Sequence, residues 1–97
     1  RQAEAQADPL WRLPLWAPYG RLIESRIADL NNAGEERMAG SITAALFLKR
    51  FVSQARAWAH LDLYAWNKRA RPGRPVGGEA QTMRTLFAVI AQRYSLA

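Results

Sequence analysis

The residues best suited to chemistry are His60 and Asp62, which stand two positions apart in the sequence WAHLD. In an extended strand this spacing places an imidazole and a carboxylate on one face, where they could bind a metal ion or exchange a proton. A metal site needs a third or fourth ligand, and the sequence has no second histidine and no cysteine. We therefore expect a structural role, with His60 hydrogen-bonded in the core and Asp62 paired with a neighbouring backbone group or arginine.

A basic loop follows this pair. Residues 68–74 carry four cationic side chains that could contact phosphate groups, and Tyr64 and Trp66 could stack on the bases of a single strand. The cluster lies in a stretch rich in Pro and Gly and has no recognition helix. We therefore expect a solvated loop in which one arginine pairs with a carboxylate.

A glycine pair, Gly77-Gly78, precedes a predicted helix, and its backbone N–H groups could bind an anion. Such a pair more often only permits a tight turn into the helix, and we favour that interpretation. The sequence contains no nucleophile elbow, no phosphate-binding P-loop and no dinucleotide fingerprint. The residues alone therefore assign no catalytic activity.

Three helices must position these motifs, because apolar residues recur at helical spacing in three stretches. The first covers residues 18–30, where Pro18 suits the first turn and Gly34 follows the end. The second runs from about residue 40 to residues 53–56, and its nearly all-round apolar surface predicts packing on more than one side.

Two further predictions concern the cap of the second helix and the surface of the third. The Ser41 hydroxyl could cap the second helix. The third helix covers residues 79–94 and carries a regular apolar stripe. The stripe consists of Met83, Leu86, Phe87, Ile90 and Tyr94.

A strand is predicted over residues 57–66, because apolar residues alternate there with His60 and Asp62. Residues 10–15 could form a short edge strand, since Pro14 cannot donate a ladder hydrogen bond. An isolated strand leaves its backbone groups without partners. We therefore predict an α/β fold with about three helices and one or two strands, in which most of the sheet lies outside this chain.

Length, composition and charge limit the number of domains and the class of protein. Ninety-seven residues allow one domain at most, and 49% apolar residues argue against disorder. No apolar run approaches the ~20 residues that span a bilayer, and residues 1–9 form a polar lead without an anchor, which we expect to be flexible. The chain begins with Arg1, which we interpret as a trimmed or incomplete start. The net charge of +6 leaves a small basic helical nucleic-acid-binding module as the alternative function, although no predicted helix has a basic face.

Five separated pieces of the sequence carry a family resemblance. They are LWRLPLW, ADLNN, AGSITAALFLKRFV, WAHLD, and GRP followed by a closing helix. In order and spacing they resemble the C-terminal part of the catalytic domain of the leucine aminopeptidase (cytosol aminopeptidase) family. The resemblance implies that residues 1–97 are the C-terminal portion of a mixed-sheet, zinc-exopeptidase-like domain in a cytoplasmic homo-hexamer that cleaves N-terminal amino acids from peptide substrates.

The same resemblance implies two divalent metal ions, zinc or manganese, which activate a water molecule for attack on the first peptide bond. The metal ligands and catalytic arginine of the family come from a Lys/Asp-bearing segment and an NTDAEGR-type motif, and neither is present in this sequence. We therefore assign no catalytic or metal-binding residue. We expect this chain alone to bind no metal and to be inactive, and we expect neither membrane nor nucleic-acid partners.

Two residues are predicted to line the substrate pocket. Counting without gaps from WAHLD places Tyr64 and Asn67 where the family contacts the first side chain of the peptide. Family members that prefer leucine often carry small or aliphatic residues there, so Tyr64 would narrow or redirect the pocket. The alternative is that Tyr64 is a packing ring with its hydroxyl at the rim.

Overall fold

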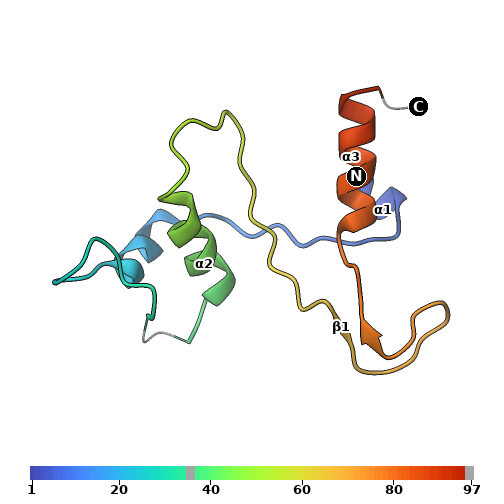
Figure 1. The fold of residues 1–97 in the computed structure, drawn as a ribbon, viewed down its shortest axis with the longest axis horizontal. Coiled ribbons are helices and arrows are strands. Elements are labelled where there is room, and N and C mark those ends of the chain that lie inside the picture. The colour runs from blue at the N-terminus through green and yellow to red at the C-terminus, as the bar shows by residue number, and fades with distance from the viewer. Residues whose placement is uncertain (35–36, 96–97) are drawn as a thin grey trace. The chain divides into compact units, whose positions relative to one another are not determined.

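The computed structural model describes residues 1–34 and 37–95 (Figure 1). In order along the chain its elements are α1 (Gln2–Ala5), the 3-10 helix η1 (Ala17–Ile23), α2 (Gly40–Lys49), β1 (Trp66–Asn67), β2 (Gly77–Gly78) and α3 (Met83–Arg93). They form two compact units, one from residues 12–62 and one from residues 1–11 with the chain from residue 63 onward. The helices and the small two-stranded sheet make this an α/β fragment, as the sequence predicts.

In the unit of residues 12–62, η1 packs against α2. Proline stands in the first turn of η1 as expected, but the helix ends at Ile23 and does not continue to residue 30. Glu24 adopts an extended conformation, and the Ser25 hydroxyl then accepts hydrogen bonds from the N–H groups of Ile27 and Ala28. A serine side chain that bonds the local backbone offers an alternative to helical bonding, which accounts for the early end.

Helix α2 begins at Gly40 as predicted and ends at Lys49, a turn or more earlier than expected. The predicted cap by Ser41 is wrong. The N-cap position is taken by Ala39 in a left-handed conformation, and no side chain caps the helix there. Ser41 lies inside the first turn, one position beyond the first helical residue, where its hydroxyl cannot act as the N-cap. Of the apolar residues in this unit, Ile23 and Ala45 are buried.

In the other unit, β1 and β2 pair in antiparallel fashion, with Trp66 opposite Gly78 and Asn67 opposite Gly77. The strand predicted over residues 57–66 therefore pairs within this chain only at Trp66, and its pairing over residues 57–64 with strands outside the chain stays a prediction. Ala65 interrupts it with a φ of 53°, and no partner strand lies beside residues 57–65 in the described part of the chain. The edge strand predicted at residues 10–15 is likewise not formed.

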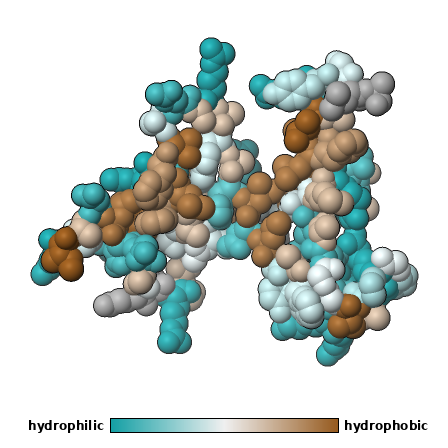
Figure 2. Space-filling view, viewed as in Figure 1, coloured by the Kyte–Doolittle hydropathy of each residue, from teal (hydrophilic) through white to brown (hydrophobic). Residues whose placement is uncertain are grey.

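Helix α3 begins at Met83 and not at residue 79, because residues 79–82 connect β2 to the helix through a turn at residues 81–82. Its predicted stripe is exposed, and Figure 2 shows hydrophobic side chains along this helix. Helix α3 also packs against α1. The expectation that residues 1–9 lack an anchor is wrong, because the buried Asp8 bonds to the start of α3. No helix among the described residues is long and apolar enough to cross a membrane.

Candidate functional site

The two residues predicted to line a pocket have opposite environments. Tyr64 is 65% exposed, and the Lys68 Nζ atom lies 5.5 Å from the centre of its ring, within cation–π range. Asn67 is only 5% exposed. Its Nδ2 atom donates to the carbonyl oxygens of Arg74 at 2.9 Å and Pro75 at 2.8 Å, so both amide hydrogens serve the hairpin. Contact of either side chain with a substrate stays a prediction.

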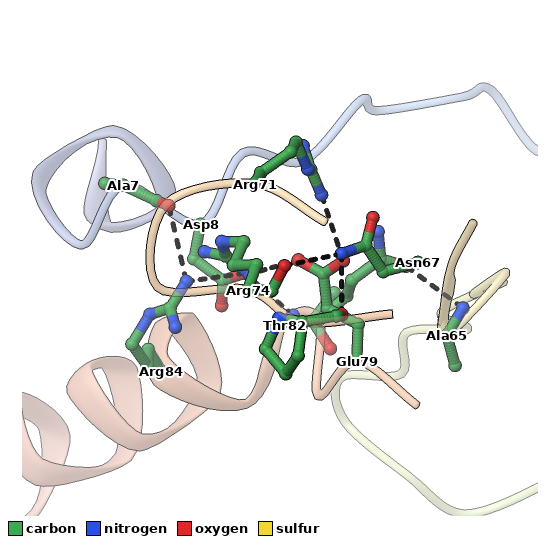
Figure 3. Close-up of polar contacts among 11 residues, drawn as sticks. Ala7, Asp8, Ala65, Asn67, Arg71, Arg74, Glu79, Thr82 and Arg84 are labelled. Carbon is green, nitrogen blue, oxygen red and sulfur yellow. Dashed lines mark hydrogen bonds and ion pairs between the residues drawn. The ribbon is translucent and has the colours of Figure 1, made fainter. Parts of the chain in front are cut away.

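The basic loop is held by a carboxylate that sequence reasoning missed. Arg71 Nη2 lies 3.0 Å from Glu79 Oε2, and Arg74 Nη1 pairs with Glu79 Oε1 (Figure 3). The Glu79 side chain is 9% exposed, so both guanidinium groups compensate a largely buried charge. The prediction of one arginine–carboxylate pair is confirmed and extended to two. The signal was an acidic residue shortly after a Pro-Gly turn flanked by arginines.

Ala65 lies at the centre of a second set of contacts. Its N–H donates to Gln81 Oε1 at 3.1 Å, and its carbonyl oxygen accepts from the Glu79 N–H at 2.9 Å. An alanine with a φ of 53° adopts a conformation that costs a residue with a Cβ atom about 1 kcal/mol or more. We call the side chains that bond this position or hold the adjoining hairpin loop the hairpin brace. It consists of Asn67, Arg71, Arg74, Glu79 and Gln81.

A third set of contacts joins residues at opposite ends of the sequence. Asp8 Oδ1 accepts from the Thr82 N–H at 3.0 Å, and Oδ2 accepts from the Thr85 N–H at 3.1 Å. The Thr85 hydroxyl donates to the Asp8 carbonyl oxygen at 3.0 Å, and Arg84 Nη2 lies 3.7 Å from Oδ1. Since α3 has no cap from its own N-cap residue, Asp8 acts as a cap supplied from a distant part of the chain.

This environment favours the charged form of Asp8. The backbone N–H of Thr85 contributes most to holding the pKa of the Asp8 carboxyl below its usual value, and burial opposes it. Further hydrogen bonds from Thr82 and from the Thr85 side chain, and the charge of Arg84, act in the same direction as the first. The positive end of a helix dipole also favours a carboxylate at this place.

The other candidate residues do not assemble into a site. His60 is half-buried and stacks on Trp58, with ring centres 6.3 Å apart and an interplanar angle of 18°. Asp62 is exposed, and within residues 1–34 and 37–95 neither side chain has a hydrogen-bond or ion-pair partner, so the predicted partners are absent there. A structural role for His60 thus comes from stacking. Gly77 and Gly78 form β2, which corrects their expected role at the start of a helix.

Comparison with known proteins identifies the family of the chain, which the geometry alone does not. The family model of the cytosol aminopeptidase family, catalytic domain, matches residues 1–87. The chain belongs to the cytosol aminopeptidase family. The probable cytosol aminopeptidase of Geobacter sulfurreducens is 48% identical over 88 residues, which are 89% of this chain and 17% of that protein. That of Caulobacter vibrioides is 48% identical over 94 residues, or 94% of this chain and 19% of its own length.

A solved structure of the same family agrees in fold. The crystal structure of the cytosol aminopeptidase from Coxiella burnetii superposes with a TM-score of 0.89 at 52% identity, over 96% of this chain and 20% of that one. This member of the cytosol aminopeptidase family therefore spans about a fifth of the length of the relatives it matches. The nucleic-acid alternative finds no support among these relatives.

The family resemblance implies metal ions, and the residues at hand can be tested for their fit. Within residues 1–34 and 37–95 no group of three or more His, Cys, Asp or Glu side chains lies close enough to hold a metal ion. Two of the carboxylates already have other partners, since Asp8 caps α3 and Glu79 pairs with two arginines. These residues do not fit a two-metal centre by themselves.

Proposed function

We propose that this chain is the C-terminal part of the catalytic domain of a metal-dependent aminopeptidase, which releases N-terminal amino acids from peptides. The observation that carries the proposal is the match of the family model to residues 1–87, joined to 52% identity and a TM-score of 0.89 with the Coxiella burnetii enzyme. The relatives with the same sequence pattern bear the name cytosol aminopeptidase.

In this proposal the chain supplies packing elements and one wall of the substrate pocket. Helix α2 and the hairpin of β1 and β2 belong to the scaffold, and the exposed ring of Tyr64 is the surface offered to a peptide. Asn67 supports that wall from within the hairpin. The two divalent ions, zinc or manganese, are held by residues outside this chain, so the chain alone binds no metal and has no peptidase activity.

The proposal also covers the wider setting of the enzyme. The names of the relatives support a cytoplasmic location. The many exposed apolar side chains, among them Phe87 and Tyr94 of α3, support burial against the rest of a larger protein and its homo-hexameric neighbours. A nucleic-acid role is not proposed, because Arg71 and Arg74 are already paired with Glu79.

A segment-exchange experiment tests the function. The matching fifth of the Coxiella burnetii aminopeptidase is replaced by this chain, and the resulting chimera is assayed on an aminoacyl chromogenic substrate with manganese. The intact enzyme is the positive control, and the enzyme lacking the segment is the negative control. The 97-residue chain is assayed in parallel.

We expect the chimera to turn over substrate, and we expect neither the shortened enzyme nor the chain alone to do so. A chimera that is folded by circular dichroism and inactive at saturating manganese would contradict the aminopeptidase proposal. Turnover by the chain alone would instead contradict the claim that its catalytic groups lie elsewhere.

A further inference from the structure

Ala65 has an unfavourable backbone conformation between two exposed rings. Its φ of 53° places a residue with a Cβ atom in the left-handed region, and Tyr64 and Trp66 on either side are 65% and 51% exposed. Such strain persists only where the surrounding structure over-determines it, and it is concentrated at functional sites. The conformation of Ala65 sets how the chain turns between the rings, and therefore the direction in which each ring projects.

Glu79 and Gln81 of the hairpin brace bond Ala65 directly, and Asn67 bonds the loop of the same hairpin. Glu79 donates its N–H to the Ala65 carbonyl oxygen, while two arginines hold its largely buried carboxylate. Asn67 closes the loop by donating to two carbonyl oxygens on the far side of the Arg71–Arg74 turn. Gln81 adds one hydrogen bond, from the Ala65 N–H. Figure 3 shows Asn67, Glu79 and the two arginines gathered at the hairpin.

We propose that Glu79 and Gln81, supported by Asn67, are positioning residues of the aminopeptidase: they hold Ala65 in its left-handed conformation and thereby aim the Tyr64 ring at the first side chain of the peptide. This inference rests on the proposed function. It assigns Asn67 an indirect role, because both of its amide hydrogens bond the hairpin and neither is available to a substrate. Side-chain selectivity then depends on residues that do not touch the peptide.

The test uses the chimera that carries this chain in the Coxiella burnetii enzyme. Glu79→Gln and Asn67→Ala weaken the brace, Gln81→Ala removes one bond of it, and Tyr64→Ala removes the ring. Glu4→Gln is the matched control, because Glu4 is exposed and lies outside the brace. Each variant is assayed for kcat and KM on leucyl and phenylalanyl chromogenic substrates, and amide hydrogen exchange is followed in the peptide of residues 63–67.

We expect the two brace variants to change the ratio of kcat/KM between the substrates in the same direction as Tyr64→Ala. The ratio of kcat/KM changes by about tenfold, as it does when a pocket is altered by about one methylene group. Exchange in residues 63–67 becomes faster in the same variants, Gln81→Ala gives a smaller change of both kinds, and Glu4→Gln gives none. If Glu79→Gln or Asn67→Ala fails to fold, the milder Gln81→Ala decides.

The outcomes separate the two proposals. Faster exchange with an unchanged substrate ratio in an active chimera overturns the positioning role and leaves the aminopeptidase proposal standing. Unchanged exchange overturns the brace itself. A folded but inactive unmutated chimera overturns the proposed function, and the positioning role falls with it.

Discussion

The bond between the two ends of the sequence gives the most direct quantitative prediction. The Thr85 hydroxyl donates to the Asp8 carbonyl oxygen at 3.0 Å, and each of these residues is 4% exposed. Replacing Thr85 with Val keeps the shape and removes the donor. The carbonyl oxygen is then left without its buried partner, which costs about 1–2 kcal/mol.

The assay is amide hydrogen exchange in the 15N-labelled chain. The N–H groups of Thr82 and of residue 85 both donate to the Asp8 carboxylate, so their exchange reports the opening of this contact. A loss of about 1–2 kcal/mol makes exchange through local opening about five- to thirtyfold faster. Thr43→Val is the control, because the Thr43 hydroxyl bonds only carbonyl oxygens at the start of its own helix, α2.

Two results would refute the reasoning. If Thr85→Val leaves the exchange of both amides within about twofold, the hydroxyl bond contributes less than about 0.5 kcal/mol and the contact is not a stabilising cap. If Thr43→Val accelerates the same α3 amides as strongly, the effect is a general loss of stability and not the loss of this bond.

Three further predictions concern Asp8, Ala65 and Arg74. The backbone N–H groups at the start of α3 lower the pKa of the Asp8 carboxyl. The stability that this carboxylate contributes is therefore fully present above the unfolded pKa of about 3.9 and is lost as the pH falls through the lower folded pKa. Urea unfolding at a series of pH values shows this loss, and Asp8→Asn abolishes it. In Ala65→Gly, relief of the left-handed strain offsets the entropy cost of the more flexible glycine, so the free energy of unfolding changes by less than about 0.5 kcal/mol. The control Ala44→Gly, inside α2, costs about 1 kcal/mol. A similar loss at both positions in thermal denaturation would contradict the strain at Ala65. Arg74→Met removes a partly exposed partner of the largely buried Glu79 carboxylate and lowers the free energy of unfolding by about 1 kcal/mol. The control Arg69→Met changes it by less than about 0.5 kcal/mol. Equal effects of the two substitutions in urea titrations would argue against the ion pair.

Local sequence signals predicted the helices better than the strands. Gly40 begins α2 and a proline stands in the first turn of η1, because backbone preferences of single residues decide such starts. The early ends depend on competing local bonds, such as those of the Ser25 hydroxyl, which a periodicity count does not register. The strand over residues 57–66 pairs here only at Trp66, because its other partners were expected outside this chain, and the alternating pattern gave no sign of the left-handed conformation at Ala65.

The candidate site was predictable only in part. The family resemblance assigned both Tyr64 and Asn67 to the substrate pocket, but it could not show that Asn67 bonds the hairpin while Tyr64 stays exposed. Glu79 was missed although its arginine partners are only five and eight residues away, whereas Asp8 was missed because its partners come from a distant segment. A contact such as that between Asp8 and Thr85 spans 77 residues and leaves no short-range pattern to detect.

The distance in sequence between Asp8 and α3 has a consequence for synthesis on the ribosome. Asp8 emerges 74 residues before Thr82, which at about 5–20 residues per second corresponds to roughly 4–15 s. During that interval the carboxylate has no helix to cap, and once α3 emerges its first turn has no acceptor of its own. Helix α3 is therefore expected to consolidate late, when it folds back onto Asp8, so slowing translation near residue 82 should prolong the period in which this segment is open to proteases and chaperones.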